Sequence, residues 1–149
     1  MNPHSIKLQW AIVCMGGAVD QQTNSLSLFD ILEEFQIGVK EKITSEGIFV
    51  PRSFKFISLW CNDKGKALSF LTKIVLQSPD GEQLMELEGE LSVPENKFAH
   101  RHIVDFPGFQ IKGGGRYKFL VYKKEKDESN YQLEKDVPFD VKIEIIKTF

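Results

Sequence analysis

The feature that most constrains the fold is a strict two-residue alternation of apolar and polar side chains close to the end of the sequence. Every second residue from Val137 to Ile145 is apolar, and the residues between them are Pro, Asp, Lys and Glu. Successive side chains of a β-strand point to opposite faces of its sheet, whereas an α-helix repeats about every 3.6 residues. The alternation therefore predicts a strand with one face on a core and the other in water.

The same alternation recurs along the chain, and turn-forming residues separate the repeats. Ser78-Pro79-Asp80-Gly81, for example, has the Pro and Gly positions of a type I turn. The pattern predicts about seven to nine short strands. The segments expected to form them are residues 6–15, 25–37, 53–61, 69–77, 83–92, 98–106, 115–124 and 136–146. Such strands predict an all-β fold: a two-sheet antiparallel β-sandwich, immunoglobulin-like or C2-like, whose last two strands form a hairpin.

One segment also fits a helix. In residues 27–35, the apolar residues Leu28, Ile31, Leu32 and Phe35 follow helical spacing, and Ser27 with Asp30 imitates a capping box. We favour a strand, because turn residues precede the segment and the strand upstream offers a hairpin partner. The polar residues 40–47 are then expected to cross from one sheet to the other.

Composition narrows the class of protein. With 149 residues and 42% hydrophobic content, the chain is expected to form a single domain, residues 1–149. The net charge of -2 gives no bulk attraction to nucleic acid or to a membrane. The apolar run from Trp10 to Met15 is too short for a membrane span or a signal peptide. Cys14 and Cys61 lie within predicted strands, so we expect two buried, reduced thiols and a cytoplasmic protein.

His100 and His102 are the one candidate metal pair. Residues two apart on a strand point the same way, so both imidazoles could reach one metal ion. No neighbour in sequence supplies a third ligand. A metal-dependent enzyme using His100 and His102 is therefore a hypothesis, and two polar side chains at the exposed end of a strand are the favoured interpretation.

Three glutamates, Glu86, Glu88 and Glu90, form a row on one strand face. Carboxylates two residues apart on a strand are separated by about 7 Å, too far to share a proton. A calcium site would need ligands clustered on loops. The favoured interpretation is a solvated face paired with lysines of neighbouring strands, which also discourages edge-to-edge aggregation.

No catalytic or cofactor motif is present. The sequence lacks a G-x-S-x-G elbow, and burial would leave both cysteine thiols inert. We therefore expect no enzyme activity, no cofactor and no metal. Trp10 and Trp60 could form a platform for a small ligand or carbohydrate, but their alternating placement favours the core.

The basic residues between Arg116 and Lys126 interleave with aromatic rings, as in single-strand nucleic-acid binding. Acidic residues follow at once and cancel the charge, so solvation of a hairpin tip, residues 123–136, is the favoured interpretation. Tyr131, within that tip, would suit a contact with a partner protein.

Three consecutive glycines, Gly113 to Gly115, precede Arg116 and Tyr117. A phosphate-binding loop would lead into a helix and would carry a Lys-Ser or Lys-Thr pair, and neither follows here. We expect instead a close approach to a strand. Tyr117 is predicted to be a buried corner tyrosine whose hydroxyl bonds back to upstream backbone.

Three parts of the sequence together resemble a family of small uncharacterised bacterial proteins, classed as a domain of unknown function. They are Thr23–Ile31 after an opening strand that ends in Asp20, the Ser78–Gly81 turn between two middle strands, and Gly115–Phe119 before a closing Val137–Val141. The resemblance implies strands, a bacterial cytosolic source and no particular activity. The sequence thus predicts a non-enzymatic protein-binding or assembly module. Its partner would be another protein or a second copy. A small-ligand or carbohydrate-binding sandwich is the alternative.

Overall fold

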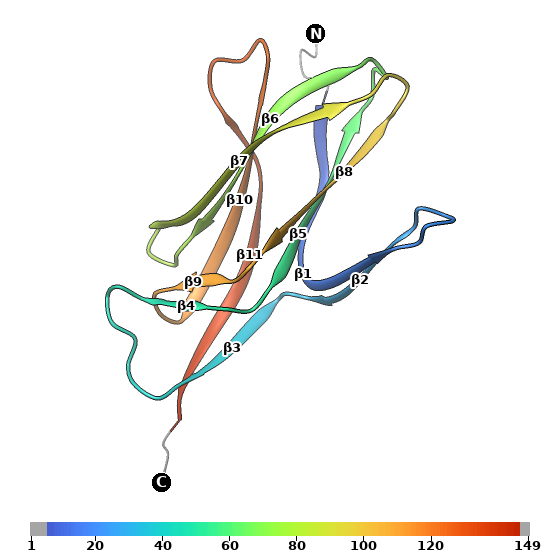
Figure 1. Cartoon of the computed structure of the whole chain (residues 1–149). Helices are drawn as coiled ribbons and strands as arrows, with labels where there is room; N and C mark the ends of the chain where they lie inside the picture. The colour runs from blue at the N-terminus through green and yellow to red at the C-terminus, as the bar shows by residue number, and fades with distance from the viewer. Residues whose placement is uncertain (1–5, 147–149) are drawn as a thin grey trace.

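The computed structural model describes residues 6–146, which form eleven strands and no helix (Figure 1). The first sheet has four strands in the order β2-β1-β5-β8. Their bounds are β1 (Ile6–Val19), β2 (Leu26–Ile31), β5 (Phe54–Asn62) and β8 (Ala99–Phe106).

The second sheet has five strands in the order β3-β11-β10-β6-β7. Their bounds are β3 (Glu34–Val39), β6 (Leu68–Gln77), β7 (Gln83–Val93), β10 (Gly115–Glu125) and β11 (Gln132–Ile145). A small third sheet pairs β4 (Ile48–Val50) with β9 (Phe109–Ile111). The fold is therefore all-β, as predicted.

Three details of the predicted sheets were wrong. The five-stranded sheet is mixed rather than antiparallel, because β3 runs parallel to β11. The strand number exceeds the prediction because the three-residue strands β4 and β9 are too short to show an alternation. The predicted strand at 25–37 is also two strands.

The chain changes sheets within that predicted strand. Asp30 has a positive φ of 55°, and the Leu32 amide bonds to the Val13 carbonyl at 2.8 Å. After this irregularity β2 has ended in the first sheet, and β3 begins in the second at Glu34. The strand interpretation of residues 27–35 is confirmed over the helical one, and residues 40–47 then lead from β3 back toward the first sheet.

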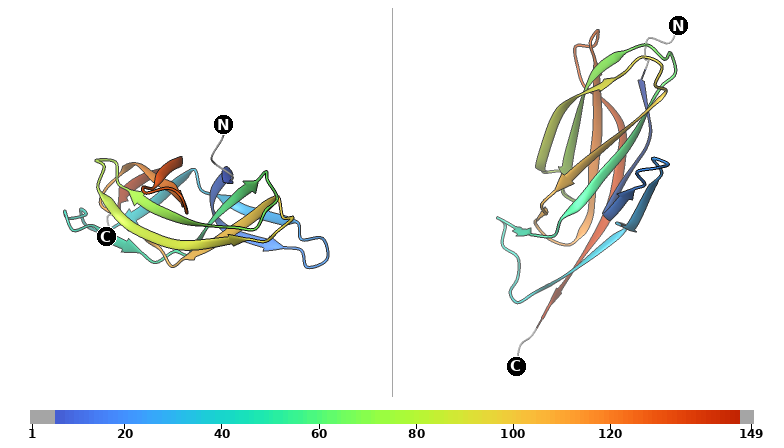
Figure 2. Two further views of the ribbon diagram at one scale, coloured as in Figure 1. Left: turned by 90° about the horizontal axis from the view of Figure 1, so that it is seen from above. Right: turned by 45° about the vertical axis from the view of Figure 1, so that its right-hand side comes forward.

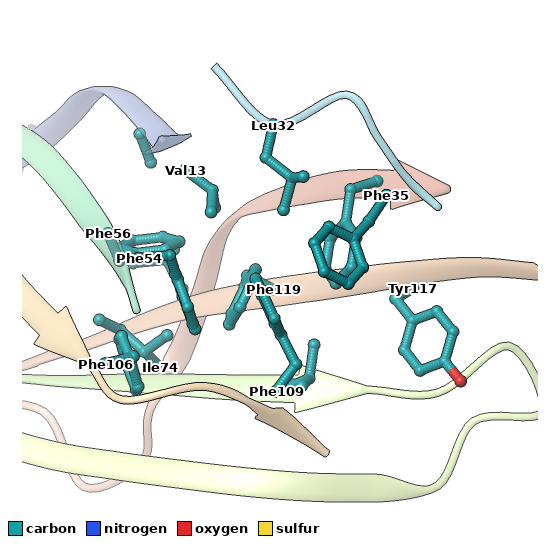
Figure 3. Close-up of a cluster of buried hydrophobic side chains, with 14 of the residues drawn as sticks. Val13, Leu32, Phe35, Phe54, Phe56, Ile74, Phe106, Phe109, Tyr117 and Phe119 are labelled. Atoms are coloured by element: carbon teal, nitrogen blue, oxygen red, sulfur yellow. The ribbon is translucent and has the colours of Figure 1, made fainter. Parts of the chain in front are cut away.

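Aromatic rings join the two large sheets in one core (Figure 3). The Phe56 ring of β5 packs 5.3 Å from the Phe119 ring of β10, and Trp60 packs 4.9 Å from Phe70 of β6. Phe54 stacks on Phe109, with ring centroids 4.0 Å apart. Several of the twelve phenylalanines of the sequence therefore hold the two sheets together. Each aromatic pair contributes about 0.5–1.5 kcal/mol to stability beyond the burial of its surface.

The corner predicted at Tyr117 is confirmed. Its side chain is 0% exposed, and its hydroxyl donates to the Gly113 carbonyl at 2.6 Å and accepts from the Lys112 amide at 3.0 Å. Burial raises the pKa of the Tyr117 phenol. Gly115 has a φ of 136°, and a side chain there would meet the Pro79 ring, so the glycines serve a close backbone approach.

Candidate binding surface

The outer side of the four-stranded sheet carries apolar side chains. On β5, Phe56 and Trp60 point into the core, so the alternating residues Ile57 and Leu59 point outward. Opposite residues of paired strands share a face, which extends the outward set to both neighbouring strands. On β1, the outward set includes Trp10, which lies opposite Leu59, and Ile12, which lies opposite Ile57. On β8 it includes Ile103, which lies opposite Ile57 from the other side.

We name these five residues the outer apolar strip. Ile57 is buried by its neighbours, Trp10, Ile12 and Leu59 are half-buried, and Ile103 is 38% exposed. None of the five belongs to the core cluster between the sheets. An antiparallel sheet with one face in water normally carries polar residues there, so contiguous apolar side chains across three strands make this face a candidate contact surface.

Polar groups border the strip. Lys55 on β5 forms an ion pair with Asp105 on β8 at one end. Arg101 on β8 donates to the carbonyl of Asn24 at 3.2 Å, which places the turn between β1 and β2 beside this face. An apolar centre with charged groups of both signs at its margin is the usual composition of a protein–protein interface.

Trp10 is on this surface because of a β-bulge. The pairing of β1 with β5 is regular at Leu8, opposite Trp60, and shifts by one residue before Trp10, which lies opposite Leu59. The bulge turns Trp10 outward, although Leu8 and Trp10 are two apart in sequence. The expectation that both tryptophans lie in the core was therefore wrong for Trp10. It was right for Trp60, which is 0% exposed and donates its indole N–H to Ser58 at 3.0 Å.

Beyond the strip, the end of β1 and β2 form a hairpin that projects from the sheet in Figures 1 and 2. On β2, Phe29 is 55% exposed and Ile31 is 54% exposed. These large exposed apolar side chains extend the candidate surface onto the hairpin.

The two cysteines are both free thiols, in agreement with the predicted absence of a disulfide. Cys14 is buried, and burial raises the pKa of its thiol. Cys61 is only half-buried and its thiol donates to the Gln9 side chain at 2.9 Å. The prediction of two buried thiols was therefore right for Cys14 alone.

His100 and His102 point inward, not into water at a strand end. His100 pairs with Trp60 and His102 with Ser58, so both imidazoles share the core-facing side of the sheet. Both are half-buried. Removal from water lowers the pKa of each, helped by Lys97 at His100 and by His100 at His102.

His102 lines a groove of about 350 Å³ between β8 and the facing edge strand β7, whose other lining residues include Thr72, Glu88 and Gly89. Throughout residues 6–146, no cluster of three or more His, Cys, Asp or Glu side chains is arranged for a metal ion. The structure thus brings the two imidazoles to one side of β8, as predicted, without a third ligand from the described residues.

The five-stranded sheet presents charges on its outer side. Glu86, Glu88 and Glu90 are all exposed there, and Lys73 of β6 lies 3.9 Å from Glu86. The predicted pairing of this row with a lysine of the next strand is thus confirmed at Glu86.

Tyr131 lies against the same charged face. Its hydroxyl donates to Glu88, and its ring lies under the ammonium groups of Lys73, at 4.5 Å, and Lys124, at 5.5 Å. Removal from water and the Glu88 carboxylate raise the pKa of Tyr131 to about 12. The hairpin tip that carries Tyr131 is thereby attached to the sheet of its own chain.

Lys123 contradicts the interpretation of residues 123–136 as a solvated tip. It is 2% exposed, and its ammonium group donates to the Ile6 carbonyl at 2.7 Å and to Glu125 at 3.0 Å, with Glu134 at 3.7 Å. Its alternation on β10 places it on the same side as the core residue Val121. The sequence offers no signal for this, since a buried lysine depends on partners that lie elsewhere in the chain.

Comparisons with known proteins assign no family to the chain. No family model matches the chain, and no curated protein matches it. One solved structure with a similar arrangement is the C-terminal domain of wzt, at 9% identity and a TM-score of 0.49, with 93% of this chain and 74% of that one covered.

Two further structures are larger proteins. One is the alkylpurine DNA glycosylase AlkC of Pseudomonas fluorescens, bound to DNA containing an abasic site analog. It has 8% identity, a TM-score of 0.48, and coverage of 92% of this chain and 30% of that one. The other is a family 123 glycoside hydrolase from Clostridium perfringens, with 10% identity, a TM-score of 0.40, and coverage of 97% and 28%. At these identities and TM-scores, none of the three assigns a function to this chain.

Residues 6–146 also contain no helix with the length and apolar composition needed to cross a membrane.

Proposed function

We propose that this protein is a non-enzymatic binding or assembly module that contacts another protein through the four-stranded sheet. The outer apolar strip carries the proposal. It places one tryptophan and four aliphatic side chains on the solvent side of a sheet whose other side already packs on the core. Burying apolar surface stabilises a complex by about 25 cal/mol per Å², so binding is favoured when a partner excludes water from this face.

The composition of the face favours a protein partner. Tryptophan is among the residues that contribute most to binding when a contact buries them, and Trp10 is one of the five residues of the strip. The Lys55–Asp105 ion pair and Arg101 supply both signs of charge at the border. Such charges contribute more to the choice of partner than to affinity.

We further propose that the two large sheets form an immunoglobulin-like or C2-like sandwich and that the protein works in a bacterial cytosol. The ring contacts Phe56–Phe119 and Trp60–Phe70 across the core support the sandwich, as does the corner at Tyr117. The free thiols Cys14 and Cys61 support a reducing compartment.

A pair of matched variants tests the binding face. Ile103→Lys puts a charge on the strip at a side chain that is 38% exposed, whereas Leu133→Lys makes the same change at a 55% exposed residue of β11, in the other sheet. We expect a protein captured from lysate of the source organism, then purified, to bind the wild type and Leu133→Lys in calorimetry. Binding to Ile103→Lys should fall at least about tenfold, or 1.4 kcal/mol.

Equal binding by the two variants would contradict the assignment of the face. Thermal unfolding of both variants checks that the fold is retained. A wild type that binds neither a purified protein nor itself would overturn the proposal as a whole.

Carbohydrate binding is the second candidate, favoured by the outward position of Trp10. Because Trp60 is fully buried, any change in tryptophan fluorescence on adding oligosaccharides would come from Trp10. A saturable change that Trp10→Phe abolishes would favour this candidate, whereas an unchanged spectrum would count against it.

A further inference from the structure

The partner of this module can be specified from the free edge of β2. We infer that a second copy of this chain pairs antiparallel with β2, edge to edge, about a two-fold axis at Leu28. The inference rests on the proposed function, since it names a partner for the same sheet. It uses a different part of that sheet, the projecting hairpin rather than the outer apolar strip (Figure 2).

Within residues 6–146, β2 has one unpaired side. It is the first strand in the order β2-β1-β5-β8, and its ladder joins it to β1. The other side of an edge strand presents backbone N–H and C=O groups that can accept a further strand. Two-fold symmetry suits this edge, because antiparallel pairing of identical strands places the same residues on both sides of the axis.

The backbone hydrogen bonds of the hairpin show which residues of β2 face the free edge. At the start of the hairpin, the Asp20 amide donates to the Ser25 carbonyl at 2.9 Å, which marks residues 20 and 25 as a hydrogen-bonded pair. Bonded and non-bonded pairs alternate along an antiparallel ladder. Ser27 and Phe29 therefore direct their backbone groups toward β1, whereas Leu26 and Leu28 direct theirs toward the free edge.

Leu28 fixes the register of the two β2 strands. With the free N–H and C=O groups of Leu28 bonded to Leu28 of the second copy, Ser27 lies opposite Phe29 of that copy. The regular ladder ends there, because Asp30, which comes level with Leu26, has a positive φ of 55°. Asp30 is the one charged residue of β2, so no like charges meet across the pair. The exposed side chains of Phe29 and Ile31 then have neighbouring strands on both sides, β1 of their own chain and β2 of the second copy.

The edge strand β7 shows the contrast. Its residues Glu86, Glu88 and Glu90 would place rows of carboxylates close together if two copies paired there. Charges of this kind are how natural sheets block edge pairing. The apolar side chains of β2 lack such protection.

A six-residue strand sets the strength of the pairing. An interface of this kind falls below the size of standard stable interfaces, about 1,200–2,000 Å² in total. We therefore expect a weak dimer in rapid exchange, monomeric near about 10 µM and mostly dimeric near about 1 mM.

Sedimentation velocity over that concentration range tests the dimer. Leu28→Pro removes an N–H group that faces the free edge, so it should keep the monomer fold and shift the dissociation constant upward at least about tenfold. Ser27→Pro is the matched control, because its N–H group faces β1. It should lower the unfolding temperature more than Leu28→Pro does.

A disulfide trap tests the register independently. Bonded residues across an antiparallel pair have Cα atoms about 5.5 Å apart, within the range that a disulfide spans. In a Cys61→Ser background, with Cys14 buried, Leu28→Cys should form a covalent dimer under mild oxidation. The control Leu133→Cys, on β11, should stay monomeric.

Concentration-dependent dimers that Leu28→Pro weakens, together with a selective Leu28→Cys cross-link, would support the inference. A wild type that stays monomeric up to about 1 mM would overturn it. Dimers unaffected by Leu28→Pro would also overturn it, by showing that another surface pairs. In either case, loss of a purified partner's binding in Ile103→Lys would leave the proposed function standing.

Discussion

The outer side of the four-stranded sheet carries Trp10, Ile12, Leu59 and Ile103, whereas the outer side of the five-stranded sheet carries charged side chains such as Lys73 and the row of glutamates on β7. The inner sides differ as well. On the core-facing side of the four-stranded sheet lie the half-buried His100 and His102, whereas the buried Lys123 lies on the core-facing side of the five-stranded sheet.

The difference shows that two sheets that cover the same core can expose different kinds of side chain to solvent. The outer charges of the five-stranded sheet pair with one another, as at Lys73–Glu86 and Lys118–Asp136, and Tyr131 lies over them. The charged side chains named here therefore find their partners within the same chain. The outer apolar strip is covered only in part: Ile57 is buried, but Ile103 is 38% exposed and the other three side chains are half-buried. This remaining exposure is why we propose partner contact for the four-stranded sheet.

Breaking the buried charge group should have the largest effect on stability. Lys123→Met removes the buried ammonium group that donates to the Ile6 carbonyl and to the Glu125 carboxylate. We expect a loss of about 3–5 kcal/mol in the free energy of unfolding, measured by urea denaturation. Lys124→Met, the neighbouring change on the outer side, should stay within about 0.5 kcal/mol. Equal losses would show that the two sides of β10 do not differ as described.

Removing the Tyr117 hydroxyl should have the next largest effect. Tyr117→Phe leaves the Lys112 amide and the Gly113 carbonyl without this partner in a buried corner. The expected loss is about 1–3 kcal/mol. The matched change Tyr122→Phe, on the half-buried outer side of β10, should cost less than about 0.5 kcal/mol. A Tyr117→Phe protein as stable as the wild type would contradict the role of the corner.

The inward histidines should make stability depend on pH. Their folded-state pKa values are lowered from 6.5, so the unfolded chain binds protons first as the pH falls. The histidines should not lower the free energy of unfolding above about pH 6.5. Below that pH the free energy of unfolding should decrease, by at most about 1.4 kcal/mol per pH unit for each histidine.

His102→Gln should flatten this slope, because His102 is one of the two groups responsible. Unfolding free energies from pH 7.5 down to about 5.5 measure the effect, a range above the ordinary titration of carboxylates. An unchanged slope in a His100→Gln, His102→Gln double variant would show that the histidines do not cause it.

The smallest effect is expected at the charged face itself. Tyr131→Phe removes a hydroxyl that donates to an exposed carboxylate, so stability should change by less than about 1 kcal/mol. Because the pKa of Tyr131 is about 12, the variant should also lose one of the late steps in an alkaline absorbance titration. Loss of an early step instead would place the Tyr131 phenol in free solvent.

Much of the fold could be predicted because alternation is a local signal. The predicted segments at 53–61, 69–77, 83–92, 98–106 and 115–124 agree with β5, β6, β7, β8 and β10 to within about one residue at most ends. Tyr117 could be placed because glycines upstream demand a close backbone approach. The small strands β4 and β9 could not, since three residues carry no periodicity.

The candidate surface was harder to predict than the fold. On β5 both sides of the strand are apolar, with Phe56 and Trp60 on one side and Ile57 and Leu59 on the other. Alternation separates these two sets but does not say which set is inside. The bulge that turns Trp10 outward depends on pairing with β5, which a single segment does not reveal.

By itself, the sequence determined the all-β class, most strand positions and the Tyr117 corner, because each follows from residues that are neighbours in the chain. Only the tertiary structure decided that Trp10 faces outward, that Lys123 is buried and that His100 and His102 face inward. The physical reason is that the face a side chain occupies, and the partner that makes its burial tolerable, come from strands distant in sequence. Lys123 and the Ile6 carbonyl, 117 residues apart, are the clearest case.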